Sequence, residues 1–220
     1  TAAIVLWGGL EGDIFRKIQL AGFHVVGIMT TTGFATADFD QWTAAAKSIL
    51  LLLMIIGACA GSTGGAIKVV RILLVLKSGY RELRHVLHPK AVIPLRLGSI
   101  SVKDEMLRPS NIFVAMYIII FAQASLLLAI ISYHDPRMTI ETVLSAVAAT
   151  LGNVGPGFGM VGPTLSFAEI HPAGKMLLFL CMWIGRLEIV TALVMLVPEF
   201  WKKQIRLIAQ PALFLARSPA

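Results

Sequence analysis

The pattern of apolar and polar residues occurs twice along the chain. Apolar residues over 15–29 and again over 139–150 each predict a short helix, followed by a stretch rich in glycine and small polar residues. At 1.5 Å per residue these helices would be about 22 Å and 18 Å long, which is less than the roughly 30 Å apolar core of a membrane. A loop, 37–42 or 159–172, follows each of them. The pattern therefore predicts re-entrant helices that stop partway across a bilayer.

Three longer segments are candidates for crossing the membrane. Residues 112–132 carry no charge and are long enough to cross. Residues 48–67 are also uncharged, but glycines crowd their second half, so we expect this helix to break inside the membrane. Residues 176–197 contain Arg186 and Glu188, which we expect to face protein or water because charge at membrane depth is costly. The two charges are not expected to pair, since residues two apart point to different faces of a helix.

Composition and charge agree with a membrane protein. Mean hydropathy is +0.81, 57% of the residues are hydrophobic and only 14% are charged. Of 19 Lys and Arg residues, nine lie within 68–108 and four within 202–217, whereas 133–172 has one. The positive-inside rule then places 68–108 and the C-terminal tail in the cytoplasm and 133–172 outside. The basic residues indicate contact with membrane lipid, and nucleic acid is not an expected partner.

The two glycine-containing stretches are the candidate functional site. Non-helical backbone at membrane depth is stable where it lines a cavity or is buried in protein. Backbone carbonyls there can replace the hydration shell of a cation, and glycine permits the required backbone conformations. The expected ion filter consists of Thr31, Thr32, Gly33, Phe34, Asn153, Val154, Gly155 and Pro156, with K⁺ at Thr32, Gly33, Asn153, Val154 and Gly155. Ordinary turns between membrane helices are the alternative, which the repetition of the pattern disfavours.

Other chemistry has less support in the sequence. His24, His134 and His171 lie apart from Cys or carboxylate clusters at ligand spacing, so a metal centre is not predicted. Cys59 and Cys181 both fall within apolar segments and are expected to be packing residues inside helices. We expect no enzymatic activity, because the sequence offers no nucleophile with a plausible base. A noncatalytic membrane scaffold, whose glycine hairpins serve packing, is the other class of protein left open.

Four motifs together resemble a known family. They are Thr31-Thr32-Gly33-Phe34, Gly61-Ser62-Thr63-Gly64-Gly65-Ala66-Ile67-Lys68, Asn153-Val154-Gly155-Pro156-Gly157-Phe158 and Gly185-Arg186-Leu187-Glu188-Ile189. In this order they resemble the third and fourth pore repeats of the Trk/Ktr/HKT superfamily, especially a bacterial Trk-type K⁺ uptake subunit. The resemblance implies an all-α membrane protein built from repeated units of helix, re-entrant pore helix with filter loop, and helix. Four such units would surround one potassium-channel-like pore.

The resemblance also implies a gate. Residues Gly61, Ser62, Thr63, Gly64 and Gly65 would form an intramembrane loop that obstructs the pore below the filter. Arg186 would be a cationic barrier beside that loop. Ala66 stands where many relatives carry a further glycine. Close helix packing through small residues is the alternative to a gate.

The function implied is K⁺ uptake across the bacterial cytoplasmic (inner) membrane by a multi-pass protein, with symport of Na⁺ or H⁺ left open. Implied partners are K⁺ itself, membrane lipid, a cytosolic nucleotide-binding regulatory subunit and a second copy of the full-length subunit; no covalent cofactor is expected. Residues 1–108 would be part of the third repeat with its basic cytoplasmic connection, 109–203 the fourth repeat, and 204–220 a cytoplasmic tail. Since the chain supplies two of four filter loops, it should not conduct alone.

Overall fold

The computed structural model describes residues 1, 9, 12–57, 59, 62, 64–88, 94–97, 100, 101 and 104–187. Its helices are α2 (Ile14–Met29), α3 (Ala44–Ile55), α4 (Val69–Leu87), α5 (Asp104–Ile131), α6 (Ile140–Leu151) and α7 (Pro172–Arg186). Short 3₁₀ turns occur at η1 (Phe39–Gln41), η2 (Gly159–Val161) and η3 (Phe167–Glu169). A two-residue antiparallel pair, β1 (Arg96–Leu97) with β2 (Ile100–Ser101), precedes α5. The predicted all-α membrane fold is confirmed, with this small ladder as an addition.

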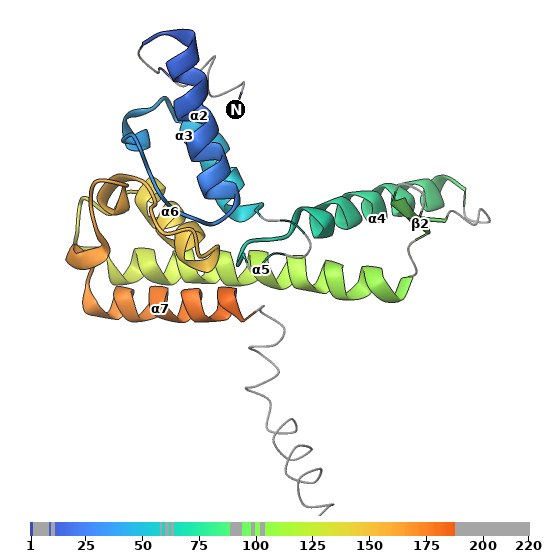
Figure 1. Ribbon diagram of the computed structural model, residues 1–220. Coiled ribbons are helices and arrows are strands. Elements are labelled where there is room, and N and C mark those ends of the chain that lie inside the picture. The colour runs from blue at the N-terminus through green and yellow to red at the C-terminus, as the bar shows by residue number, and fades with distance from the viewer. Residues whose placement is uncertain are drawn as a thin grey trace, which may run out of the picture.

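The helices pack around α5 and α6 (Figure 1). Helix α7 runs beside α5, and α6 lies against both of them. Helices α2 and α3 form a pair that contacts the rest through α3 and α6, while α4 packs along the N-terminal part of α5. Together, α4 and that part of α5 form an arm that projects away from the other helices.

Side-chain caps define where four of the helices begin. Asp13, Thr43 and Thr139 each accept a hydrogen bond from a backbone N–H in the first turn of α2, α3 and α6. At α7, His171 is the cap and Pro172 occupies the first turn. Such residues satisfy N–H groups that lack a partner within the helix, and proline at this position removes one of those groups. The caps therefore fix the two re-entrant helices α2 and α6 at their starts.

Helix α6 lies at the centre of the structure. From Thr142 to Leu151 nearly all of its side chains are buried. One apolar cluster joins α6 to α5 and α7 around Tyr117 and Leu128, and a second joins it to α2 and α3 around Phe39. Because α6 contributes to both clusters, its position couples the two halves of the chain.

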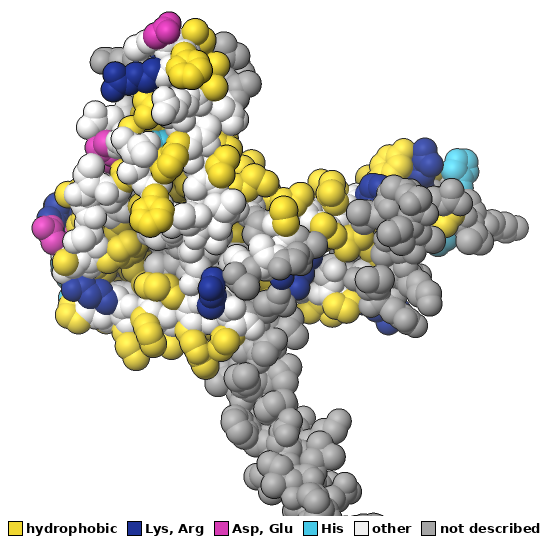
Figure 2. Space-filling view, viewed as in Figure 1, with side chains coloured by type: hydrophobic (Ala, Val, Ile, Leu, Met, Phe, Trp, Pro, Cys, Tyr) yellow, Lys and Arg dark blue, Asp and Glu magenta, His cyan; other side chains and the backbone are white. Residues whose placement is uncertain are grey.

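The longest helix begins earlier than the sequence indicated. Helix α5 starts at Asp104 and passes through Pro109, whereas hydropathy alone predicted 112–132. Among the described residues, its segment Leu107–Ile131 is the one stretch that is both long and apolar enough to cross a membrane. Figure 2 shows apolar side chains over much of the visible surface. Exposed ones on α5 and α7 include Ile118, Ile119, Leu126, Leu127, Ile130, Phe179 and Met182.

The predicted break within 48–67 is present, and it changes the interpretation of one cysteine. Helix α3 ends at Ile55 and α4 begins at Val69. Cys59 therefore lies outside any helix and is exposed, so the expectation of a packing residue inside a helix is wrong there. The glycines that end the helix also remove Cys59 from it. Cys181 is buried in α7, as expected.

Candidate ion filter and gate

Two loops follow the re-entrant helices and share one backbone conformation. We call residues 30–36 the first pore loop and residues 152–158 the second. Thr31 and Asn153 both have positive φ, 56° and 55°, and the glycine two residues later does too, 76° at Gly33 and 118° at Gly155. Positive φ is uncommon outside glycine and especially so for a β-branched residue such as threonine. Different sequences therefore adopt the same alternation of backbone handedness.

The hydrogen bonds of the two pore loops also match. Thr32 N donates to Gly27 O at 2.8 Å, and Val154 N donates to Ala149 O at 2.8 Å. The following residue of each loop, Gly33 or Gly155, donates to the same carbonyl at 3.3 Å and 3.4 Å respectively. Each loop is therefore tied back to the last turn of its own re-entrant helix. The pattern repeats with the spacing that separates Gly33 from Gly155.

The helices direct their C-terminal ends at these loops. Helix α2 ends at Met29 and α6 at Leu151, immediately before the first and second pore loops. A helix C-terminus carries the negative end of the helix dipole and favours a cation nearby. Neither helix has a basic residue in its last turn to neutralise that end. Both helix ends therefore keep a partial negative charge beside the loops.

The two pore loops touch each other at Gly33. A Cβ atom at Gly33 would lie 2.1 Å from the carbonyl oxygen of Val154 and 3.3 Å from Cδ of Pro156. A side chain cannot fit there without moving the second loop. Gly155, by contrast, has open space around the position of a Cβ and is exposed. Gly33 thus permits close approach of the loops, whereas Gly155 leaves room for a side chain.

Side chains of the predicted filter residues have several roles. The hydroxyls of Thr30 and Thr32 are 2.8 Å apart, and Phe34 is 72% exposed. Val154 is buried, and the Asn153 amide donates from Nδ2 to Met182 O on α7 at 3.2 Å. The side chain of Val154 is therefore a packing group and that of Asn153 braces the loop. This leaves backbone oxygens as the main candidates for cation contact.

The glycine-rich loop, residues 57–66, joins α3 to α4. Its ends are pinned together, since Ile67 N donates to Ile55 O at 2.9 Å and Gly57 N donates to Ile67 O at 3.2 Å. Within it the structure describes Gly57, Cys59, Ser62, Gly64, Gly65 and Ala66. The predicted gate residues Gly61 and Thr63 lie outside the described residues.

The end of the glycine-rich loop lies against the second pore loop. A Cβ at Gly65 would be 2.7 Å from Nδ2 of Asn153 and 3.2 Å from the carbonyl oxygen of Gly185 in α7. Arg186, the residue after Gly185, closes α7 and has an exposed side chain. Sequence spacing alone did not show that these segments meet. Glu188 lies outside the described residues.

A buried histidine, His24, which the sequence presented only as isolated, joins α2 to the residue that follows the first pore loop. His24 is fully buried in α2, with its Nδ1 2.8 Å from Leu20 O and its Nε2 3.4 Å from the N–H of Ala37. The rings of Phe39 and Trp42 contact it edge-on at centroid distances of 5.5 Å and 5.1 Å. With its proton on Nδ1 the ring donates to Leu20 O and accepts from Ala37 N, and with its proton on Nε2 it donates to Ala37 O, which lies 3.2 Å away. The available signal was a histidine on the same helical face as the apolar residues of α2.

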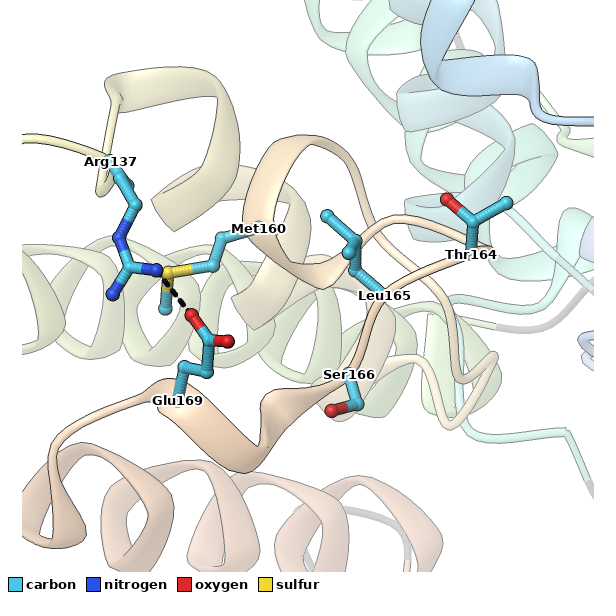
Figure 3. Close-up of a pocket in the computed structure, with 6 residues that line it drawn as sticks. All are labelled: Arg137, Met160, Thr164, Leu165, Ser166 and Glu169. Carbon is cyan, nitrogen blue, oxygen red and sulfur yellow. Dashed lines mark hydrogen bonds and ion pairs between the residues drawn. The ribbon is translucent and has the colours of Figure 1, made fainter.

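A cluster of charged side chains lies in the loops that precede α6 and α7. Arg137 pairs with Asp135 at 3.1 Å and also with Glu169, beside a cavity of about 580 Å³ that Met160 and Leu165 help to line (Figure 3). The hydrogen bonds from Arg137 hold the pKa of the Asp135 carboxyl below its usual value. This group joins two loops at the surface, and its residues are separate from both pore loops.

Two re-entrant helices that end in matched, contacting loops define a pore-loop membrane protein. The chain belongs to the TrkH family of cation transport proteins, whose profile matches residues 14–203. It is accordingly a multi-pass protein of the bacterial inner membrane, as predicted.

Relatives agree in sequence and structure. The chain is 36% identical over 201 residues to the Trk system potassium uptake protein TrkH of Escherichia coli (strain K12), covering 91% of this chain and 40% of that protein. It is 35% identical to the TrkH of Halomonas elongata over the same shares of both chains. The crystal structure of the potassium transporter TrkH from Vibrio parahaemolyticus superposes with a TM-score of 0.78 at 37% identity, over 90% of this chain and 41% of that one. The chain thus spans about 40% of the length of these relatives.

Proposed function

We propose that this chain forms half of a K⁺ uptake pore, in which the two pore loops supply two quarters of a selectivity filter. The observation that carries the proposal is the matched backbone of the loops, including positive φ at Thr31, Asn153, Gly33 and Gly155. Two loops of different sequence keep one left-handed conformation, which is strained at Thr31. Backbone strain that is retained at a candidate site is the pattern expected of a functional constraint.

Backbone oxygens near the filter glycines would replace part of the hydration shell of K⁺. Gly155 borders open space, and Val154 presents its carbonyl oxygen toward Gly33. The remaining oxygens would come from two further pore repeats. Helix α2 leaves Ile14, Phe15 and Val26 exposed, which offers an apolar face for such a repeat.

Each segment of the chain has its own place in this proposal. Residues 1–108 would contribute the third repeat, 109–203 the fourth and 204–220 a cytoplasmic tail. The glycine-rich loop would obstruct the pore below the filter, because Gly65 packs against Asn153 and is adjacent to Gly185. Arg186 would add a positive charge that repels K⁺ while the loop is closed.

The same proposal includes two protein partners. A cytosolic nucleotide-binding regulatory subunit would contact the basic segment 68–108, where α4 exposes Lys77 and Arg84. The full-length subunit would form a homodimer. Transport is proposed without an enzymatic step, and coupling to Na⁺ or H⁺ would show as a dependence of K⁺ uptake on either gradient.

Glycine substitutions in the full-length subunit, expressed in cells that lack other K⁺ uptake, test the filter. Gly33→Ser would push the loops apart, and Gly155→Ser would place a side chain in the open space beside the second pore loop. Both are expected to reduce K⁺ uptake or lower its preference over Na⁺. Gly79→Ser is the matched control for the preference of K⁺ over Na⁺, because Gly79 of α4 has open space around it and lies outside the pore loops. Unchanged uptake and selectivity in both filter variants, at normal protein levels, would favour the scaffold alternative.

A further inference from the structure

A carboxylate from one repeat holds the backbone of the other. Asp40 lies in η1, a few residues after the first pore loop, and its Oδ1 accepts a hydrogen bond from the N–H of Gly159 at 2.9 Å. Gly159 begins η2, directly after the second pore loop. The contact joins residues that are 119 positions apart in sequence. It therefore links the segments that follow the C-terminal ends of the two pore loops.

A lysine reinforces this contact. Lys47, in the first turn of α3, places its Nζ 3.5 Å from Asp40 Oδ1 and 2.7 Å from Glu141 Oε1 in the first turn of α6. The same ammonium lies 5.9 Å from the centre of the Phe158 ring. The side chains of Lys47 and Asp40 are only 19% and 29% exposed, so solvent screens their attraction incompletely. We name Asp40, Lys47, Glu141 and Gly159 the inter-repeat clamp.

The backbone at Gly159 is also fixed from the side of α6. A Cβ there would lie 2.3 Å from Thr142 Oγ1, and φ is +61°. The preceding N–H, of Phe158, donates to Ser145 Oγ at 2.8 Å. Phe158 in turn meets Phe39 edge-on with a centroid distance of 5.7 Å, and both rings are buried. The C-terminal end of the second pore loop is thus held by α6 on one side and by Asp40 on the other.

We propose that Asp40 is a positioning residue of the filter: by holding Gly159 it sets the distance between the two pore loops. This inference rests on the proposed function of the loops as parts of a K⁺ filter. Because Gly33 already lies against Val154, a shift of either loop alters the space between the filter glycines. A filter that selects among dehydrated cations depends on the placement of its oxygens. Loss of the clamp should therefore change the preference for K⁺ over Na⁺ more than the rate of K⁺ uptake.

Two substitutions at Asp40 distinguish the effect of its hydrogen bond to Gly159 from the effect of its negative charge. Asp40→Ala removes both the hydrogen bond and the charge, whereas Asp40→Asn removes the same charge but keeps an oxygen that can accept from Gly159 N. In proteoliposomes containing the full-length subunit, the ratio of K⁺ to Na⁺ uptake is expected to fall roughly tenfold in Asp40→Ala, the factor that corresponds to one hydrogen bond to a charged group. Asp40→Asn should retain most of the wild-type ratio.

Two results would overturn the inference. A wild-type ratio in Asp40→Ala would show that the clamp does not position the filter. Equal losses in Asp40→Ala and Asp40→Asn would assign the effect to surface charge, for which Glu169→Gln, at an outer carboxylate away from the pore loops, is the comparison. If Asp40→Ala does not reach the membrane, Lys47→Gln leaves Asp40 in place and should lower the ratio by a smaller factor, and an unchanged ratio there would contradict the clamp.

The same assay separates this inference from the proposed function. Gly155→Ser should change uptake or selectivity if the pore loops are a filter at all. An effect of Gly155→Ser together with a wild-type ratio in Asp40→Ala would remove the clamp and leave the filter. No effect of Gly155→Ser would remove the filter itself.

Discussion

Thr31 and Asn153 occupy equivalent positions in the two pore loops and have nearly identical backbone φ angles, 56° and 55°. Asparagine tolerates this left-handed conformation, whereas threonine, with its branched Cβ, rarely adopts it. The first loop keeps the conformation despite the less suitable residue. Surrounding contacts must therefore impose it, among them the hydrogen bonds of the loop to the last turns of α2.

Thr31→Gly should cost less stability than Thr32→Gly. Glycine removes the left-handed strain at Thr31, about 1–2 kcal/mol for an L-residue, which equals or exceeds its entropic cost of about 0.5–1 kcal/mol. At Thr32, where φ is not positive, glycine brings the entropic cost and removes the hydroxyl contact with Thr30. Thermal unfolding of the two variants in detergent measures the difference. A lower melting temperature for Thr31→Gly than for Thr32→Gly would show that Thr31 is not strained.

His24→Leu should destabilise the first pore loop. The variant leaves the partly buried N–H of Ala37 without its imidazole partner, a loss of about 1 kcal/mol or more. His134→Leu is the control, because His134 is exposed. Hydrogen exchange at Ala37, measured by mass spectrometry, should rise in His24→Leu and stay at the wild-type level in His134→Leu. Equal exchange in both variants would contradict a supporting role for His24.

The sequence was sufficient to predict the elements of the site but not the contacts between them. Helix length, glycine content and the lack of charge predicted both re-entrant helices and a break within 48–67. Positive φ at Thr31 was not predictable, because threonine disfavours it and contacts with the surrounding structure impose it. Likewise, hydropathy placed the start of α5 too late, because it does not detect a helix that continues beyond its apolar segment.

Long-range polar contacts were missed for a related reason. Asp40 and Gly159 come from different repeats, and a single hydrogen bond between them leaves no periodic signal in either segment. His24 was seen only as an isolated histidine, since its partners Leu20 and Ala37 contribute backbone atoms. The exposure of Cys59 follows from the helix break, which sequence analysis had located without applying it to that residue.

The ion pair of Asp135 and Arg137 should have a defined pH dependence. Hydrogen bonds from Arg137 lower the pKa of Asp135 from its usual value of 3.8. A carboxyl with a lowered pKa in the folded state stabilises the protein at pH values above 3.8 and loses that contribution as the pH falls through the lowered pKa. Asp135→Asn should therefore reduce the melting temperature by a constant, small amount at neutral pH.

The reduction caused by Asp135→Asn should disappear in strong acid, where the wild-type carboxyl is protonated. Arg137→Gln, which removes the partner, should show the same dependence. A difference between wild type and Asp135→Asn that grows as the pH falls below 3.8 would contradict the assignment. Melting temperatures recorded across an acid-to-neutral series, at constant ionic strength, provide the measurement.

Arg186→Ala should increase K⁺ flux or weaken its regulation. Arg186 follows Gly185, which borders Gly65 of the glycine-rich loop. Removing the Arg186 guanidinium therefore takes a positive charge away from the proposed gate. Flux through the full-length subunit in vesicles is the measurement, and Arg137→Ala is the control, since Arg137 belongs to the separate surface group with Glu169. Equal flux in Arg186→Ala and wild type would remove the gate role from Arg186.

The central claim is that the two pore loops bind a dehydrated cation with their backbone oxygens. Crystals of the full-length subunit grown with Rb⁺ in place of K⁺ test it directly, because the anomalous signal of Rb⁺ locates the ion. The account predicts an anomalous peak in direct contact with backbone oxygens around Gly33 and Gly155. Absence of a peak between the loops, in crystals that show Rb⁺ elsewhere along the pore, would contradict it.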